Sequence, residues 1–479
     1  MADLRIDNAV LVTMDETRRV IEDGSVAVEG ERIVAVGPTE EIATAHPSGE
    51  VIDGEGMAAM PGFVDVHAHA GHGLIKTMGG GDGNAWYEAC RQVYTRASDP
   101  AFWHAEAALA GLERLKAGVT TGVSLLGGGD SVMRTDKRDH ADAHFDAITD
   151  LGIRVVLAIG PTRPPFPWTY SSWASGTEET YEVTFEEQIA TCETLIASRH
   201  GSEGRRLNIA MLSPTLRKEH LDGASPAEFE ELVSQARKAS AVARANGLVF
   251  TQDGHKEGTA KFAHETLGIL GPEALLSHST DFTDEEIAIC AATGTKIAHN
   301  PSAVASILGR CRAVEMMEAG VVVAIGSDGT APDRSGDMFR HMQQAMHYHR
   351  RHFRDSSVLP PGRVMEMATI DGAVALGMED DIGSLTVGKR ADVILIDLKK
   401  PHLYPPNMPL FRIACFANGA DVDTTIANGK VLMKGRKVLS VDEDKVLEDA
   451  ARETETMLSR TGLAPLIDTP ATFFGTTRG

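Results

Sequence analysis

The sequence lacks the usual signs of a secreted, membrane-spanning or nucleic-acid-binding protein. Its five cysteines are dispersed, with no CxxC pair, and such an odd count fits a reducing compartment. No run of about 18 apolar residues is present, and the N-terminus has no basic region followed by an apolar one, so we expect neither a membrane span nor a signal peptide. Basic residues are also few, because 46 Lys and Arg oppose 68 Asp and Glu for a net charge of −22. We therefore expect a cytoplasmic protein that binds neither nucleic acid nor a membrane.

Short strand-like segments occupy both ends of the chain. Residues 4–60 contain strand-forming stretches interrupted by Gly, Asp and Glu, and similar stretches return at 391–398 and 423–440. A polar helix is expected at about 441–461. A chain of 479 residues fits one large domain and a smaller one. We predict that residues 1–58 and 383–479 together form a small β-sandwich domain that includes this C-terminal helix.

The middle of the chain, residues 59–382, alternates helices with apolar strands. Helical segments end at glycines that directly precede apolar strands, as in KAGVTTGVSLL and DLGIRVVLAIG. Such glycines cap helices, and strands of this kind are buried on both faces of a parallel sheet. The spacings Ser225–Glu228 and Thr283–Glu286 are those of capping boxes. Since the glycines at 79–83 do not lie between a strand and a helix as a Rossmann turn requires, we predict an α/β fold of the (β/α)₈ TIM-barrel type.

Residues that can bind a metal follow the predicted strands of this region. His67 and His69 follow the first strand, and later strands lead into Asp253 and His255, His278, His299 and Asp328. The carboxyl ends of barrel strands share one face, where active sites form. His67 and His69 are two residues apart, so their side chains point to the same side of a strand. The pattern predicts an open catalytic site for one divalent ion, with zinc favoured and iron, cobalt or manganese also compatible.

Several motifs together resemble the amidohydrolase superfamily, in the branch of atrazine chlorohydrolase and the cytosine and guanine deaminases. The matching stretches are Pro61–His69, Gly118–Thr121, Leu276–His278, His299–Ser302, Gly326–Gly329 and Gly383–Val393. Trp86 falls where this branch commonly carries a tryptophan after the first strand, and we expect it to contact substrate. The resemblance covers nearly the whole chain and implies a metal-dependent hydrolase of small molecules, which we expect to be a homo-oligomer.

The resemblance also implies a role for each site residue. His67, His69, a third histidine from the fifth strand and Asp328 would bind the ion, which lowers the pKa of a water molecule. Asp328 would accept the proton of that water, and His278 would orient the water or polarise the group under attack. A helix N-cap is the structural alternative for Asp328. For His299 we prefer a turn-forming role to that of a ligand.

The fifth strand departs from the family pattern. Relatives usually carry His-x-x-Glu there, with the glutamate moving a proton to the leaving nitrogen, whereas residues 251–257 read TQDGHKE. We predict that His255 is the third ligand, that Gly254 gives the chain the freedom to aim it inward, and that Gln252 contacts substrate. Asp253 is the rival ligand. If Asp253 binds the ion instead, His255 becomes the candidate for the missing proton shuttle.

We predict a metal-dependent hydrolase that cleaves a C–N bond, or a C–S or C–Cl bond, of a small urea, carbamate, amide or N-heterocycle. The missing glutamate favours a urea- or carbamate-type carbonyl, because ring deamination needs an acid for the departing amine. One alternative is an aminohydrolase of an N-heterocycle, which would need Glu257 or another acid. A non-catalytic barrel is the second alternative, although four convergent polar groups argue against it. We interpret the histidines between residues 341 and 352 as solvent- or subunit-facing.

Overall fold

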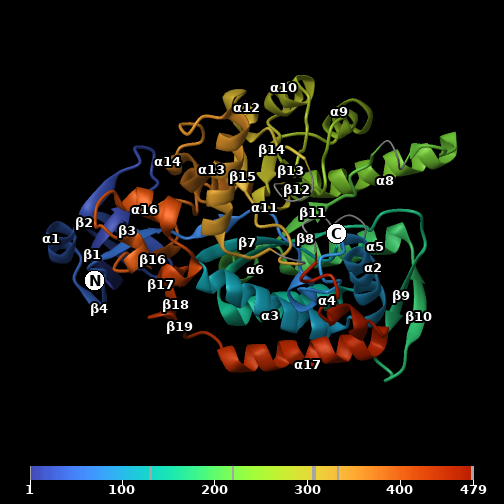
Figure 1. Ribbon diagram of the computed structural model, residues 1–479, viewed down its shortest axis with the longest axis horizontal. Coiled ribbons are helices and arrows are strands. Elements are labelled where there is room, and N and C mark those ends of the chain that lie inside the picture. The colour runs from blue at the N-terminus through green and yellow to red at the C-terminus, as the bar shows by residue number, and fades with distance from the viewer. Residues whose placement is uncertain (1, 129–131, 218–220, 305–308, 332–333, 476–479) are drawn as a thin grey trace.

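The computed structural model describes residues 2–128, 132–217, 221–304, 309–331 and 334–475. Eight parallel strands form one sheet in chain order: β6 (Phe63–Asp65), β7 (Val119–Leu125), β8 (Arg154–Ile159), β11 (Leu207–Leu212), β12 (Phe250–Gln252), β13 (Ala274–Ser277), β14 (Lys296–His299) and β15 (Val323–Ile325). The first strand meets the last where the Val66 N–H donates to Ile325 O (3.3 Å) and the Asp328 N–H to His67 O (2.8 Å). These two bonds close the sheet, and the predicted barrel is confirmed (Figure 1).

Helices alternate with these strands and surround the barrel (Figure 1). They are α3 (Pro100–Lys116), α4 (Arg138–Leu151), α5 (Phe185–Arg199), α6 (Ser202–Arg205), α8 (Pro226–Ala245), α9 (Thr259–Phe262), η4 (Ala263–Leu267), α10 (Asp284–Thr293), α11 (Pro301–Ala303), α12 (Ala313–Glu318), α13 (Met338–Phe353), α14 (Pro361–Met367) and α15 (Ile370–Ala375). The predicted capping boxes are present at the starts of α8 and α10. Gly152 and Gly294 end α4 and α10 with φ of 90° and 71°, a left-handed conformation that glycine adopts without steric cost.

The loops at the mouth of the barrel carry further short elements. The long connection after β6 contains η1 (His72–Ile75), α2 (Gly83–Gln92) and η2 (Val93–Ala97), and the connection after β8 contains the hairpin β9 (Trp168–Ser172) and β10 (Glu179–Val183). These loops stand at the carboxyl ends of the barrel strands, where the predicted site lies.

A second sheet combines the two ends of the chain. Its nine strands are β1 (Ala2–Val12), β2 (Val20–Glu29), β3 (Arg32–Pro38), β4 (Ser48–Asp53), β5 (Met57–Pro61), β16 (Val393–Asp397), β17 (Val422–Ala427), β18 (Lys430–Lys434) and β19 (Lys437–Val438). β5 pairs with β1 on one side and with β16 on the other, so segments from both termini lie side by side (Figure 1). The predicted β domain from both chain ends is confirmed, and its strands hydrogen-bond into one mixed sheet. Its boundaries at residues 58 and 383 stay a prediction.

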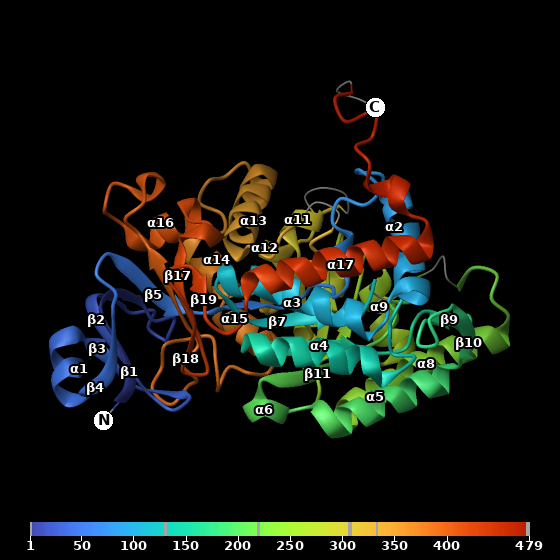
Figure 2. The same cartoon turned by 90° about the horizontal axis from the view of Figure 1, so that it is seen from below.

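The C-terminal segment returns to the barrel. The remaining elements are α1 (Thr39–Ala45), η6 (Pro401–Leu403), α16 (Pro409–Phe416), η7 (Gly419–Asp421), α17 (Glu443–Thr461) and η8 (Ala464–Ile467). The predicted polar helix is α17, which lies along α3 and η2 (Figure 2). Beyond it, Leu466 O accepts a hydrogen bond from the Gly79 N–H (2.8 Å), which ties this segment to the loop that carries Trp86. Within the described ranges, no helix is both long enough and apolar enough to cross a membrane.

Candidate metal centre

Three imidazoles and two carboxylates converge at the carboxyl ends of the barrel strands. The Asp253 carboxylate lies 3.4 Å from His67 Nε2 and 3.5 Å from His69 Nε2. The same carboxylate lies 3.1 Å from His278 Nε2. Asp328 Oδ1 lies 3.2 Å from His69 Nε2, and Asp328 Oδ2 lies 3.9 Å from His278 Nε2. The structure therefore brings four of the predicted site residues together, with Asp253 between them.

This cluster fits a divalent cation. Two overlapping sets, His67 with His69 and Asp253 and His67 with His278 and Asp328, each hold ligand atoms within 4.8 Å of one another. Both ring nitrogens of His67 are buried and make no hydrogen bond to any described residue. An unpartnered polar atom in the protein interior is unfavourable, and coordination of an ion would remove that cost. Imidazole nitrogens and carboxylate oxygens are the ligands of catalytic zinc and related ions.

The orientation of His69 leaves one nitrogen free for an ion. His69 Nδ1 lies 3.1 Å from the carbonyl oxygen of Gly127. A carbonyl oxygen only accepts hydrogen bonds, so Nδ1 carries the proton and the lone pair remains on Nε2, the atom that faces Asp328. Backbone carbonyls commonly fix metal-binding histidines in this way.

The buried Asp65 carboxylate links the first strand both to α3 and to the segment after the last strand. It accepts hydrogen bonds from the Ser327 N–H (2.9 Å) and from Arg114 Nη2 (2.9 Å). Asp65 lies two residues before His67, and Ser327 directly precedes Asp328, so these bonds position residues on both sides of the barrel closure. Asp65 lies within the motif Pro61–His69, but the motif alone does not indicate this role.

The backbone is strained at both predicted catalytic residues. His278 and Asp328 have φ of 63° and 62°, in the left-handed region that costs a residue other than glycine about 1–2 kcal/mol. The His278 N–H donates to Ala298 O (3.1 Å) and the Asp328 N–H to His67 O (2.8 Å). These bonds to neighbouring strands hold the two side chains at the mouth of the barrel.

Both carboxylates of the cluster are held in the ionised form. Burial alone would raise the pKa of Asp253, but the His67 and His278 imidazoles outweigh it and keep the pKa well below its usual value. Burial of Asp328 is likewise outweighed by the neighbouring His69, His278 and Arg334 side chains, and its pKa is also well below the usual value. An ionised carboxylate is the form that binds a cation or accepts a proton.

At the fifth strand the structure places Asp253 nearer the other candidate ligands than His255, and the identity of the third ligand stays a prediction. Asp253 lies in the cluster, whereas His255 lies outside both ligand sets, because Gly254, with φ of 77°, turns the chain between them. His255 Nδ1 lies 2.9 Å from Thr259 Oγ1, and that hydroxyl donates its own hydrogen bond to Lys256 O (2.6 Å). His255 Nδ1 therefore carries a hydrogen, and its buried Nε2 has no hydrogen-bond partner in the described chain. Burial lowers the pKa of His255 to about 3, so the ring is neutral.

The residues predicted to contact substrate lie beside the cluster. Gln252 is buried and donates from Nε2 to Pro214 O (3.1 Å), while its Oε1 has no hydrogen-bond partner among the residues described. Trp86 lies on α2, with its ring 5.0 Å from that of His72. Glu257, the residue that could have replaced the missing glutamate, is exposed on the surface.

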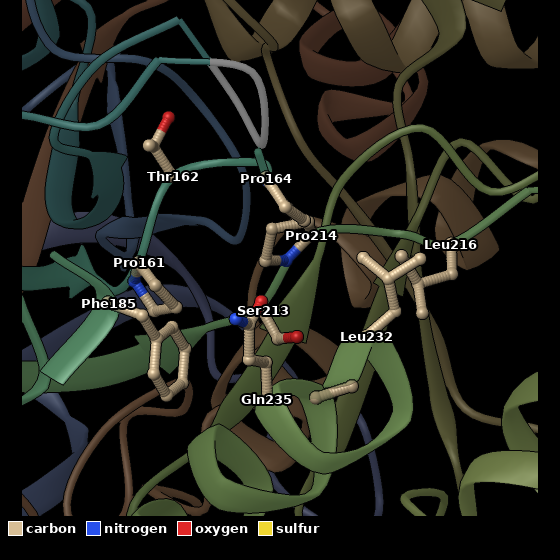
Figure 3. A pocket seen from close by; sticks show the side chains of 10 residues that line it. Pro161, Thr162, Pro164, Phe185, Ser213, Pro214, Leu216, Leu232 and Gln235 are labelled. Carbon is tan, nitrogen blue, oxygen red and sulfur yellow. The ribbon is translucent and has the colours of Figure 1, made fainter. Parts of the chain in front are cut away.

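A pocket lies between the loops that follow β8 and β11 and the helices α5 and α8 (Figure 3). Its lining is mostly apolar and comes from Pro161, Thr162, Pro164, Phe185, Ser213, Pro214, Leu216, Leu232, Gln235 and Ala236. Pro214 contributes both to this lining and to the hydrogen bond from Gln252. None of these ten residues belongs to the cluster, so we do not assign the chemistry to this pocket.

The histidine-rich segment forms part of α13. His347 and His352 are exposed, as we expected, but His341 and His349 are buried, so the interpretation as solvent-facing residues is wrong for these two. His349 Nε2 lies 3.3 Å from His299 Nε2. His299 contacts this helix and belongs to neither ligand set.

Relatives of known sequence cover most of the chain. The model described as "Amidohydrolase family" matches residues 58–432, and an imidazolonepropionase-like composite domain of bacteria matches residues 26–48. A 5-methylthioadenosine/S-adenosylhomocysteine deaminase from Desulforudis audaxviator is 33% identical over 91% of this chain and 95% of its own. A 5'-deoxyadenosine deaminase from Methanosarcina acetivorans is 30% identical over 96% of this chain and 99% of its own.

Solved structures share the fold at lower sequence identity. An adenosine deaminase from Xanthomonas campestris with bound zinc aligns with a TM-score of 0.81 and 22% identity, over 96% of this chain and 99% of its own. A mutant of atrazine chlorohydrolase from Arthrobacter aurescens, complexed with zinc and atraton, aligns with a TM-score of 0.76 and 22% identity, over 94% of this chain and 100% of its own. At these identities the alignments establish the architecture.

Proposed function

Because the chain belongs to the amidohydrolase family, we propose that it deaminates an adenine nucleoside by hydrolysing the C–N bond to the exocyclic amino group. Family membership confirms the predicted resemblance and the coarser prediction, a metal-dependent hydrolase that acts on C–N bonds. The adenine nucleoside is our choice of substrate class. It is supported by relatives named as deaminases of such compounds, which are 33% and 30% identical over nearly the whole chain.

We propose a single zinc ion held by His67, His69, Asp253 and Asp328. The distances within the cluster favour Asp253 over His255 as the ligand from the fifth strand. Zinc is the metal named in the two similar structures, which supports the choice among divalent ions. When bound, such an ion supplies a Lewis acid that makes a water molecule a nucleophile at neutral pH.

Different side chains in the cluster then transfer the proton, orient the water and bind the substrate. Asp328, ionised and buried, accepts the proton of the attacking water and gives it to the amino group, which leaves as ammonia. His278 Nε2 orients that water from the neighbouring strand. His255 Nε2 and Gln252 Oε1 are both buried without a partner in the described part of the chain, and both can accept hydrogen bonds from the amino group of the substrate.

The observation that carries the proposal is the convergence of three imidazoles and two carboxylates at one mouth. The test uses purified, zinc-replete protein with 5'-deoxyadenosine, 5-methylthioadenosine and S-adenosylhomocysteine, and follows ammonia release and the ultraviolet absorbance of adenine. Asp328→Asn is the matched control because it keeps the shape of the side chain. Ammonia release by the wild type but not by the variant supports the proposal. No ammonia from any of the three nucleosides would overturn the substrate class.

A urea or carbamate substrate is the second candidate. It is favoured by the absence of a glutamate at the end of the fifth strand, since the nearby Glu257 is exposed and outside both ligand sets. The same ammonia assay with phenylureas, together with product analysis for carbamates and thiocarbamates, separates the two. A small-molecule substrate fits either candidate, and we retain the homo-oligomer, the cytoplasmic location and the lack of nucleic-acid or membrane binding as proposals.

A further inference from the structure

His72 is a buried residue beside the metal centre that has no assigned role. It begins η1, three residues after His69 in the connection that follows β6, and it is 3% exposed. Its ring stacks on that of His69, with centroids 4.6 Å apart and planes inclined by 15°. The Trp86 ring meets it edge to face at 5.0 Å. His72 therefore lies between a proposed ligand and the tryptophan predicted to contact substrate.

The polar atoms of His72 are unused. Both ring nitrogens are buried, and neither has a hydrogen-bond partner in the ranges that the structure describes. The Trp86 Nε1 is buried in the same way. A buried donor or acceptor without a partner costs about 1–3 kcal/mol, so a phenylalanine would fill this space at lower cost if packing were the only role. The two nitrogens without a partner in those ranges indicate instead that His72 hydrogen-bonds a ligand that binds reversibly.

The space for the His72 ring depends on the last strand of the barrel. A Cβ atom at Gly329 would lie 1.8 Å from His72 Nδ1, so no larger residue fits there without displacing the ring. Gly329 directly follows Asp328 and donates its N–H to Asp328 Oδ1 (2.6 Å). The ring thus packs against the segment that carries Asp328, the proposed proton acceptor.

We propose that His72 hydrogen-bonds the substrate and determines its specificity. This inference rests on the proposed function and adds a residue that recognises the nucleoside by hydrogen bonding. A neutral imidazole offers one donor and one acceptor, which suits an uncharged group that both donates and accepts. A nucleoside has two such groups, a hydroxyl of the sugar and the edge of the purine ring. His72 is a specificity-determining residue for one of them, next to the Trp86 ring.

The test compares three variants with the wild type. His72→Phe keeps a ring and removes both nitrogens, and His72→Asn restores one hydrogen-bonding side chain. His144→Phe is the matched control, because His144 on α4 is also buried with both nitrogens unpartnered among the described residues but lies outside the metal centre. Zinc content, thermal stability, KM and kcat are measured for each with 5'-deoxyadenosine, with its 2'- and 3'-deoxy analogues and with its 7-deaza analogue.

We expect His72→Phe to keep its zinc and to raise KM about tenfold, which corresponds to one lost hydrogen bond, with a smaller effect on kcat. His72→Asn should recover part of that loss, and His144→Phe should leave KM unchanged. The wild type should have a higher KM for one analogue than for 5'-deoxyadenosine, and His72→Phe should lose this difference. If the analogue is a deoxy compound, His72 binds the missing sugar hydroxyl. If it is the 7-deaza compound, His72 binds the edge of the purine ring.

An unchanged KM in His72→Phe, or an equal loss with every analogue, overturns the inference while the proposed function stands. Loss of zinc in both His72 variants also overturns it, since the residue would then support the metal centre. Inactivity of the wild-type protein toward every adenine nucleoside overturns the proposed function and this inference with it.

Discussion

Ionisation of one buried glutamate is expected to make the stability of this protein depend on pH. Glu106 lies on α3 beneath the loop that carries His72 and is fully buried. Its Oε1 accepts a long hydrogen bond from the Gly73 N–H (3.4 Å), and Oε2 has no hydrogen-bond partner in the described structure. Burial raises the pKa of Glu106 to about 7, although the Gly71 and Gly73 backbone and, less strongly, the Arg114 and Lys76 side chains oppose the shift.

The magnitude follows from the difference between folded and unfolded chains. A glutamate with its ordinary pKa of 4.5 in the unfolded chain and about 7 in the folded one is shifted by about 2.5 units, or about 3 kcal/mol. Because the folded pKa is raised, the protonated form is the one that folding favours. The contribution is therefore complete below pH 4.5 and is lost as the pH rises through 7. At about pH 8 the wild type bears nearly the whole cost.

Glu106→Gln isolates this effect because glutamine has the same shape and cannot ionise. We expect the variant and the wild type to differ in free energy of unfolding by less than about 1 kcal/mol at pH 5, and the variant to be about 3 kcal/mol more stable at pH 8. Urea denaturation at both pH values measures this difference. Glu448→Gln, which changes an exposed residue on α17, is the control and should show no such dependence. A difference for Glu106→Gln that stays constant with pH refutes the reasoning.

Three further predictions concern the metal centre and the C-terminal helix. Elemental analysis should find one metal ion per chain in the wild type, a lower metal content in Asp253→Ala and a nearly unchanged metal content in His255→Ala. The reverse order would restore His255 as the ligand. Asp328→Asn should keep the fold and much of the metal but lose at least about a hundredfold in kcat, and near-normal turnover would move the proton acceptor elsewhere. The Arg460 guanidinium donates to Ala97 O in η2 (2.7 Å) and lies 4.9 Å from the Trp173 ring centroid. If these contacts hold the connection that carries Trp86 in place, Arg460→Met should raise KM severalfold with little change in zinc content; an unchanged KM would show that substrate binding does not depend on the contact between α17 and η2.

The architecture and most of the cluster could be predicted because local signals determine them. Glycine caps and capping boxes marked the helix ends, and the apolar strands between them required burial on both faces. Once the strands were known, the barrel rule placed His67, His278 and Asp328 at one mouth, since each directly follows a strand. None of this needed the tertiary contacts of the individual side chains.

Contacts between segments far apart in the chain could not be predicted in this way. The space for the His72 ring depends on Gly329. The connection that carries Trp86 is held to Leu466 by the hydrogen bond that the Gly79 N–H donates to Leu466 O. Helical or strand periodicity carries no information about which distant residue will lie opposite a given side chain. Such residues become visible only when the fold brings the segments together.

The fifth strand shows that ligand chemistry and side-chain direction can favour different neighbours. Imidazole suits zinc well, which favours His255 over Asp253. The direction of each side chain favours Asp253, the ligand that we propose. Asp253 directly follows the strand and accepts a hydrogen bond from Ser277 Oγ (2.6 Å), which holds its carboxylate toward the histidines. His255 lies beyond a left-handed glycine, and its Nδ1 is bound to Thr259, four residues later. A histidine with a hydroxyl partner four residues away at the start of a helix has a local alternative to metal binding, and that spacing was present in the sequence.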